Sequence, residues 1–140
     1  MSIKTVHDLK IYKESFRLAM KIFSLAKNLP DEEKYSLRSQ IIRSSRSVSA
    51  NIREGYAKRF YSKLFIRHLV DSLGSAEETR TWLEFSIECN YINGGQFQDL
   101  DRAYDSLGGM IYNTIKNWKP IENKDNEAND SEEPYDYPDF

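Results

Sequence analysis

The sequence predicts an all-α protein that folds as an up-down antiparallel four-helix bundle. Three observations lead to this fold class. Apolar residues recur at spacings of three and four in four segments, as they do on the buried face of a helix. The six Gly and four Pro are too few for a loop-rich β fold. Short connections join the four segments, and short connections place consecutive helices antiparallel.

The first helix is expected between Val6 and Leu29. Two apolar rows at helical spacing predict a wide buried face. They consist of Leu9, Tyr12, Phe16, Met20 and Phe23, and of Leu18, Ile22, Leu25 and Leu29. Pro30 ends this helix because proline disfavours helical geometry in the residue before it. Asp31 then offers a side-chain oxygen that can cap the next helix.

The second helix is expected to begin near Asp31 or a few residues later and to run to about Ala57. Its core face is predicted by spacing at about 100° per residue. This face carries Leu37, Ile41, Val48, Ile52 and Gly55. A tight turn is expected over residues 58–62, with Ser62 as the cap of the third helix.

The third helix is expected over residues 63–90, and Gly74 lies in its middle. Glycine there costs up to about 1 kcal/mol relative to alanine, so we expect Gly74 to pack closely against a neighbouring helix. The run Asn93-Gly94-Gly95 breaks the chain, and the fourth helix follows from about Phe97. It should end near Trp118, because Pro120 cannot continue a helix.

The charges divide the chain into two parts. The formal net charge is −2, but residues 121–140 contain eight acidic residues and one basic residue, which gives −7 and leaves +5 for residues 1–120. We therefore expect one folded domain over residues 1–120, with a single core, and an acidic tail over residues 121–140. The tail is poor in aliphatic residues, which predicts disorder.

Basic residues are concentrated in one window. Between residues 34 and 67 there are nine, against Glu54 alone. Arg46 and Arg53 lie opposite the core line of the second helix and can neutralise phosphates. Tyr56, Phe60 and Tyr61 interleave with these cations and can stack on unpaired bases. The candidate nucleic-acid-binding residues are Arg38, Arg46, Arg53, Lys58, Arg59, Lys63 and Arg67.

Two alternatives to nucleic-acid binding remain open for this window. The cations can meet acids elsewhere, such as Glu77, Glu78 and Glu84 on the third helix or those of the tail. The tail can also compete with nucleic acid for the basic face. A polar stripe on the flank of the second helix is interpreted as structural, fixing the register between helices or subunits. It contains Gln40, Arg43, Ser47, Asn51 and Glu54, followed by Gly55.

No pattern predicts an enzyme. The sequence has no glycine-rich phosphate loop, and its two histidines, His7 and His68, lie on different helices. The single cysteine, Cys89, cannot form an intramolecular disulfide. We expect no cofactor and no metal. The first ten residues lack the apolar core of a signal peptide, and no stretch approaches a membrane span, so we expect a cytoplasmic protein without a membrane partner.

Two groups of residues carry a resemblance to a known family. The first group is Leu29-Pro30, Glu33, Tyr35, Leu37, Gln40, Arg43, Ser47, Ala50-Asn51-Ile52 and Glu54-Gly55. The second is Phe65, Leu69, Gly74-Ser75, Glu77 or Glu78, Leu83 and Asn90-Tyr91-Ile92. Over roughly residues 6–118 the chain resembles the four-helix-bundle proteins encoded in intervening sequences of bacterial large-subunit ribosomal RNA genes.

This resemblance implies a four-helix bundle that assembles into a homopentameric barrel, with no established enzymatic activity. It also implies kinship with the accessory variability determinant of diversity-generating retroelements, a basic pentamer that binds nucleic acid and a reverse transcriptase. By position Arg43, Asn51, Glu54 and Gly55 match the motif, with a role that is structural. The chain departs from the family at Ser49, where members often have proline, and in its acidic tail.

Two functions from different classes follow. The leading hypothesis is a non-catalytic oligomeric protein that binds RNA or DNA through the basic surface of the second helix and the start of the third. The alternative is a protein-interaction scaffold that docks a partner such as a polymerase or a reverse transcriptase.

Overall fold

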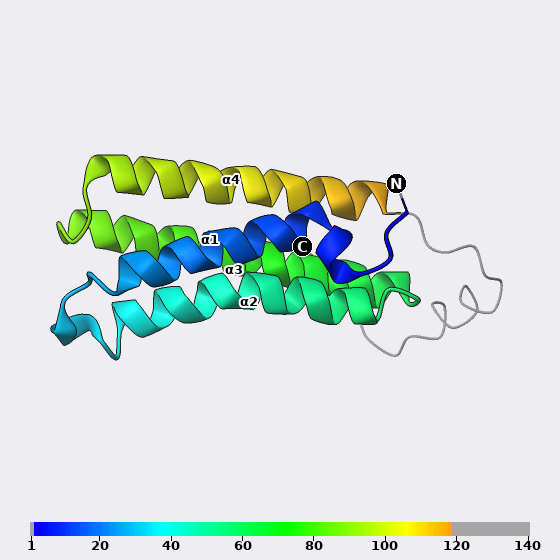
Figure 1. The fold of residues 1–140 in the computed structure, drawn as a ribbon, viewed down its shortest axis with the longest axis horizontal. Helices are drawn as coiled ribbons and strands as arrows, with labels where there is room; N and C mark the ends of the chain where they lie inside the picture. The colour runs from blue at the N-terminus through cyan, green and yellow to red at the C-terminus, as the bar shows by residue number, and fades with distance from the viewer. Residues whose placement is uncertain (1, 119–140) are drawn as a thin grey trace.

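The computed structural model describes residues 2–118, and the predicted tail lies outside them. Four α-helices run up and down along one elongated bundle (Figure 1). They are α1 (Lys10–Ala26), α2 (Leu37–Ala57), α3 (Ser62–Glu88) and α4 (Gly94–Asn117), with short 3-10 turns η1 (Val6–Asp8) and η2 (Asp31–Glu33). Because this part of the chain contains four helices and no strand, the all-α prediction is confirmed. Within residues 2–118 no helix combines the length and the apolar character needed to cross a membrane.

The core consists of apolar side chains that all four helices direct inward. The largest fully buried ones are Tyr104, Phe65, Leu18, Ile22, Ile41, Ile52, Leu69, Leu83, Leu107 and Ile111. Each helix packs mainly against the helices before and after it in the chain, and α1 also contacts α4, which closes the bundle. The core face predicted for α2 is confirmed, because Leu37, Ile41, Val48, Ile52 and Gly55 are all buried.

The predicted wide core face of α1 is wrong for two residues. Phe16 and Met20 are 53% and 52% exposed. The buried face instead follows Ile11, Ser15 and Leu18, because α2 and α4 cover only that side of the helix. Phe16 and Met20 lie on the outer side, where no helix of the same chain covers them.

The connection between α1 and α2 also differs from the prediction. Asp31 does not cap α2, because it begins the short turn η2, and α2 starts six residues later at Leu37 without a side-chain cap. Arg38 in the first turn of α2 donates a hydrogen bond to the carbonyl oxygen of Leu29, and its guanidinium lies 3.5 Å from Asp31 Oδ1. Arg38 therefore ties the connection to the start of α2.

Gly55 and Gly74 differ in how closely a neighbouring helix approaches them. A Cβ added to Gly74 would meet nothing within 4 Å, so the expected close packing at Gly74 is wrong. A Cβ added to Gly55 would lie 2.6 Å from His68 Cβ. Gly55 therefore allows the end of α2 and the start of α3 to approach closely beside the turn that connects them.

The remaining helix ends follow from local chemistry. α3 begins at Ser62, but the residue in the cap position is Tyr61, so the predicted serine cap is wrong. α3 ends where Asn90 adopts a left-handed backbone with φ 62°, a conformation that asparagine tolerates better than most residues. Asn93 caps α4, because its side-chain oxygen accepts a hydrogen bond of 2.8 Å from the backbone N–H of Gln96. The side-chain oxygen of Gln96 in turn accepts a bond of 3.0 Å from the backbone N–H of Asn93.

Candidate nucleic-acid interface

Basic and acidic residues are distributed unevenly along the length of the bundle. The start of α1, the α2–α3 turn and the end of α4 lie at one end of the bundle (Figure 1). We call this end the positive half and define it as residues 2–17, 48–74 and 106–118. It contains ten basic and four acidic residues, whereas the rest of the described chain contains eight basic and ten acidic residues. Polyanions are therefore attracted to the positive half.

The positive half gathers cations that are far apart in the sequence. Antiparallel packing brings the N-terminal segment beside the α2–α3 turn and the last turns of α4. The basic residues of this half are Lys4, Lys10, Lys13, Arg17, Arg53, Lys58, Arg59, Lys63, Arg67 and Lys116. The sequence window found the middle of this set but left out the N-terminal lysines, which lie at the same end.

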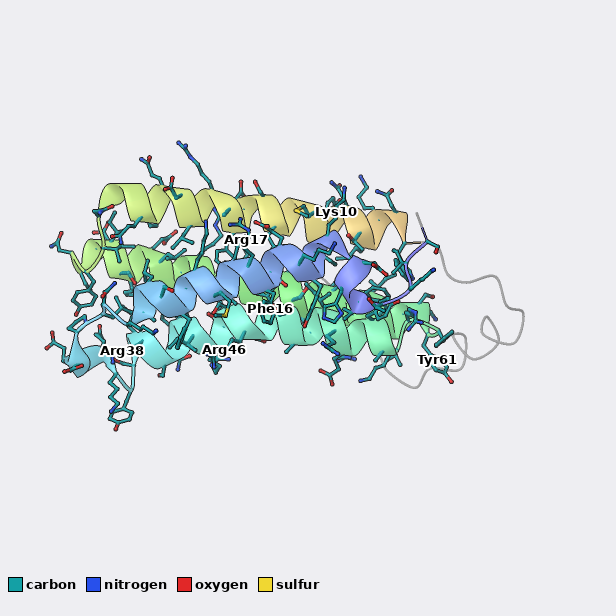
Figure 2. All side chains as sticks on the ribbon, in the orientation of Figure 1. Lys10, Phe16, Arg17, Arg38, Arg46 and Tyr61 are labelled. Atoms are coloured by element: carbon teal, nitrogen blue, oxygen red, sulfur yellow. The ribbon has the colours of Figure 1, made fainter. Side chains whose placement is uncertain are left out.

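The α2–α3 turn presents cations together with aromatic rings. Lys58 Nζ lies 3.8 Å from Glu54 Oε1, and Lys63 is exposed at the start of α3. The Arg59 guanidinium lies over the Phe60 ring, 4.8 Å from its centroid. Phe60 and Tyr61 are 47% and 39% exposed, and Figure 2 shows Tyr61 at the tip of this end. Rings and cations are thus both accessible to a ligand here.

One aromatic residue of the predicted stacking set is unavailable. Tyr56 is buried, and the Arg59 guanidinium covers its ring at 4.2 Å from the centroid. Arg59 also donates a hydrogen bond of 3.1 Å to the Tyr56 carbonyl oxygen. The expectation that Tyr56 stacks on bases is therefore wrong, because this ring packs inside the protein.

The remaining predicted arginines lie at three different places. Arg53 lies over Tyr12 of α1, with Nη1 3.3 Å from the tyrosine hydroxyl oxygen. Arg46 lies over Phe23 of α1, 5.4 Å from its ring centroid, near the middle of the bundle. Arg38 lies at the end opposite Tyr61 (Figure 2). The seven predicted residues therefore do not form one surface, and only Arg53, Lys58, Arg59, Lys63 and Arg67 share the positive half.

Few of these cations are neutralised by acids of the described chain. Among residues 2–118, Arg46, Arg53 and Lys63 form no ion pair with a carboxylate. Of the acids predicted as partners, Glu78 pairs with Arg43, and Glu77 pairs with Arg80 of its own helix at 3.1 Å. Pairing with these predicted α3 acids therefore involves Arg43 of the basic window.

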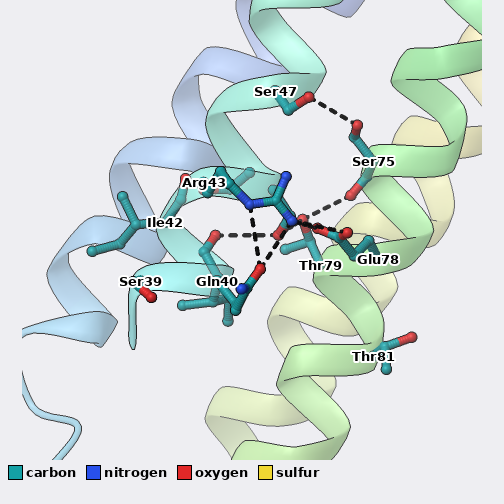
Figure 3. Close-up of polar contacts among 12 residues, drawn as sticks. Ser39, Gln40, Ile42, Arg43, Ser47, Ser75, Glu78, Thr79 and Thr81 are labelled. Carbon is teal, nitrogen blue, oxygen red and sulfur yellow. Dashed lines mark hydrogen bonds and ion pairs between the residues drawn. The ribbon is translucent and has the colours of Figure 1, made fainter. Parts of the chain in front are cut away.

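Three residues of the predicted polar stripe, Gln40, Arg43 and Ser47, lie where α2 faces α3 (Figure 3), whereas Glu54 is exposed and contacts Lys58. Arg43 donates hydrogen bonds of 2.9 Å to Gln40 Oε1 and to Glu78 Oε2. Ser75 donates one of 3.0 Å to Ser47 Oγ, and Asn51 donates one of 3.0 Å to the Ser47 carbonyl oxygen. The bonds of Arg43 to Glu78 and of Ser75 to Ser47 join α2 to α3, whereas the bonds to Gln40 and to the Ser47 carbonyl oxygen lie within α2. Bonds between two helices are how polar groups at a helix boundary set register.

Two buried hydroxyl pairs extend this set of polar contacts. Thr79 donates to Ser44 Oγ at 2.9 Å, between α3 and α2. Ser15 and Ser49 lie 2.9 Å apart between α1 and α2. Ser49 occupies the position where the family pattern often has proline, and its hydroxyl is used in a helix contact.

His68 is a residue whose environment the sequence did not reveal. Its Nδ1 lies 3.4 Å from Asn51 Oδ1, and its Nε2 lies 3.2 Å from Lys58 Nζ. Burial lowers the pKa of His68, and the positive charge of Lys58 lowers it further. His68 is therefore neutral at pH 7, and it helps to position Lys58 without adding charge to the positive half.

The described residues contain no group of three or more His, Cys, Asp or Glu side chains placed to hold a metal ion. Two pockets open on the surface of the bundle. One, of about 630 Å³, runs along the outer side of α3 and is lined by Val70, Leu73 and Gly74 together with Asp71, Glu77 and Glu78. The other, of about 610 Å³, lies between the N-terminal segment and the end of α4.

Comparison with known proteins identifies a family and a solved structure that this chain resembles. The family described as 23S rRNA-intervening sequence protein matches residues 7–113. A protein of unknown function from the S23 ribosomal protein family of Bacteroides thetaiotaomicron, known from a crystal structure, is 32% identical. The similarity covers 76% of this chain and 98% of that chain, with a TM-score of 0.70. None of the curated proteins compared matches the chain.

Proposed function

Because the chain belongs to the 23S rRNA-intervening sequence protein family, we propose that it is a non-catalytic, oligomeric protein that binds nucleic acid through its positive half. The observation that carries this proposal is the gathering of ten basic residues against four acidic ones at one end of the bundle. The names of the family and of the solved relative refer to ribosomal RNA and to a ribosomal protein family, which makes RNA the first ligand to test.

Phosphate contacts supply the affinity in this proposal. Each phosphate that a lysine or arginine neutralises releases condensed counterions, so affinity falls as salt rises. The cations at the α2–α3 turn stand on two helix ends that approach closely where Gly55 meets His68. This close approach brings cations from both helices near one another, which favours contact with successive phosphates.

Exposed rings give the proposed interface a preference for single strands. Phe60 and Tyr61 are accessible at the tip of the positive half, beside Arg59. Unpaired bases stack on such rings, with a contribution of about 1–3 kcal/mol per base. Paired bases in a duplex are already stacked on each other and offer no free face to these rings.

Assembly is proposed through two complementary faces. The outer side of α1 exposes Phe16 and Met20, with Arg46 close by on α2. The pocket along α3 has apolar walls and an acidic rim, and Gly74 leaves it open to close approach. The two faces match in apolar character and are opposite in charge, so we assign the α1 face to the α3 pocket of a second copy.

The position of these faces favours a ring. α1 and α3 lie diagonally in the bundle, because each packs mainly against α2 and α4. A contact between diagonal faces of successive copies is head-to-tail, and such contacts close into rings when the rotation allows it. Cyclic symmetry places equivalent ends at the same height along the ring axis, so positive halves of neighbouring copies lie side by side. The resemblance implies five copies.

Reversing two charges at the α2–α3 turn tests the nucleic-acid interface. The assay uses a tail-neutralised chain, in which the eight acidic residues of 121–140 are changed to Asn or Gln, because the tail is expected to compete. In this chain Lys58→Glu with Lys63→Glu should weaken binding of a fluorescent single-stranded RNA by more than tenfold. Loss of two phosphate contacts should also flatten the slope of log affinity against log salt by roughly 1.4. Fluorescence anisotropy titrations measure both quantities.

The matched control reverses two exposed cations outside the positive half, Lys34→Glu with Arg102→Glu. It makes the same change in net charge and should leave the affinity within about twofold. Equal losses in the two variants would mean that only the net charge matters, and the proposed interface would then be wrong. A protein partner that stays bound to the wild-type chain after nuclease treatment would favour the scaffold hypothesis instead.

A further inference from the structure

The acidic segment of the chain is attached at the positive half. Residues 121–140 carry a net charge of −7. The described chain ends at Trp118, whose ring packs edge-on against Phe65 with the centroids 4.4 Å apart. Phe65 lies in the first turn of α3, between Lys63 and Arg67. The last described residue before the acidic segment therefore packs beside the turn of α3 that carries Lys63 and Arg67.

We infer that residues 121–140 dock on the positive half of the molecule and occupy the proposed nucleic-acid interface. The docking itself follows from charge and from the place of attachment. Its consequence, a weakening of nucleic-acid binding, rests on the proposed function. The occupant is thus a segment of this chain, and the surface is the one that carries the excess of basic residues.

Reach does not limit this docking. The 22 residues after Trp118 span up to roughly 70 Å when extended, whereas α3, with its 27 residues, is about 40 Å long. A short flexible connection holds a tethered segment at an effective concentration in the millimolar range. Even weak individual contacts between the acids and the cations are therefore populated.

The positive half also offers an apolar receptor for the aromatic residues of the segment. The pocket of about 610 Å³ beside the end of α4 has walls that include Ile3, Leu9, Ile11, Met110 and Trp118. Lys10 lies at the same pocket. Residues 135–140 read Tyr-Asp-Tyr-Pro-Asp-Phe, so aromatic rings and carboxylates lie close together in the sequence. The pocket lining also includes the acid Asp8. Such a segment can place a ring in the pocket and its carboxylates on Lys10 and on the other cations of the positive half.

The charges of the two parts indicate that docking weakens RNA binding. The positive half has six more basic than acidic residues, and the acidic segment carries −7, so a docked segment leaves this end close to neutral. RNA must then displace the segment before it contacts the cations. Rising salt screens both interactions, with a Debye length of about 10 Å at 0.1 M.

Docking can be measured without any nucleic acid. A spin label is attached to the full chain at Asp139→Cys in a Cys89→Ser background, and the backbone amide signals are recorded by NMR. We expect line broadening at residues 56–68 and 110–118, and none at residues 28–36 and 88–96. Changing the seven acids that remain in residues 121–140 of the labelled chain to Asn or Gln should reduce this broadening severalfold, as should high salt.

The native Cys89 provides the matched control for the label. It is exposed and lies just past the end of α3, at the end of the bundle opposite the positive half. A label at Cys89 should broaden residues 28–36 and 88–96 instead. If the label at residue 139 broadens both ends equally, or broadens no amide of the bundle, the docking inference is overturned.

An RNA titration distinguishes a failure of the docking inference from a failure of the proposed function. The wild-type and tail-neutralised chains are titrated into single-stranded RNA at low salt, and we expect at least tenfold tighter binding by the tail-neutralised chain. If docking is seen but the tail-neutralised chain binds no RNA, the docking stands and the proposed function fails. If both chains bind RNA equally, the segment does not occupy the interface, and the inference fails while the proposed function stands.

Discussion

Gly55→Ala is expected to destabilise the bundle by about 2 kcal/mol, the usual cost of overpacking a tight contact. A Cβ at this position would lie 2.6 Å from His68 Cβ, which is too close for two carbon atoms. The clashing atom is next to the backbone of α3, so no flexible side chain can move aside and the helices must separate. The free energy of unfolding, measured by urea titration with circular dichroism, checks this prediction.

Gly109→Ala is the matched control for Gly55→Ala. Gly109 also lies inside a helix, but an added Cβ there would meet nothing within 4 Å. Alanine should therefore stabilise the protein by up to about 1 kcal/mol through its better helix propensity. The two glycine substitutions are expected to have opposite signs. If Gly55→Ala also stabilises the chain, α2 and α3 are not in the close contact described above.

Phe16→Glu with Met20→Glu is expected to convert the assembly into single chains. Both residues are more than half exposed in the isolated chain, so their replacement leaves the core intact. In the proposed contact they enter the α3 pocket of a second copy, beside Glu77 and Glu78. Two new carboxylates would then lie buried among existing ones, which is strongly unfavourable. Size-exclusion chromatography with light scattering measures the resulting mass.

Tyr35→Glu with Tyr112→Glu controls for added charge and lost aromatic surface. Both residues are exposed and lie outside the α1 face and the α3 pocket. This variant should keep the mass of the wild-type assembly. A wild-type chain that is monomeric at micromolar concentration, or a Phe16/Met20 variant that assembles normally, would show that these faces are not the interface.

Local sequence patterns predicted the helices and the family well. Apolar spacing depends only on helical geometry, and Pro30 and Pro120 act on their immediate neighbours, so the four helices lie within a few residues of the predicted ranges. The resemblance predicted over roughly residues 6–118 is confirmed by the family match over residues 7–113. These features required no knowledge of which helices touch.

Properties that depend on neighbouring helices could not be predicted in the same way. Phe16 and Met20 repeat at helical spacing whether a helix covers them or not, so their exposure was missed. Gly55 and Gly74 both lie inside helices, and only the packing of α2 on α3 distinguishes them. The linear basic window joined Arg38 to Lys63, although they lie at opposite ends, and omitted Lys4 and Lys10, which share the positive half.

Nucleic-acid binding by the positive half is the property on which the proposed function and the effect of the acidic segment both depend. The most direct test is the affinity of the tail-neutralised chain for single-stranded RNA across a range of salt concentrations, measured by fluorescence anisotropy. We predict binding at low salt, with log affinity falling linearly against log salt by about 0.7 for each phosphate contacted. Absence of binding at low salt by this chain, with circular dichroism showing that it is folded, would contradict the claim.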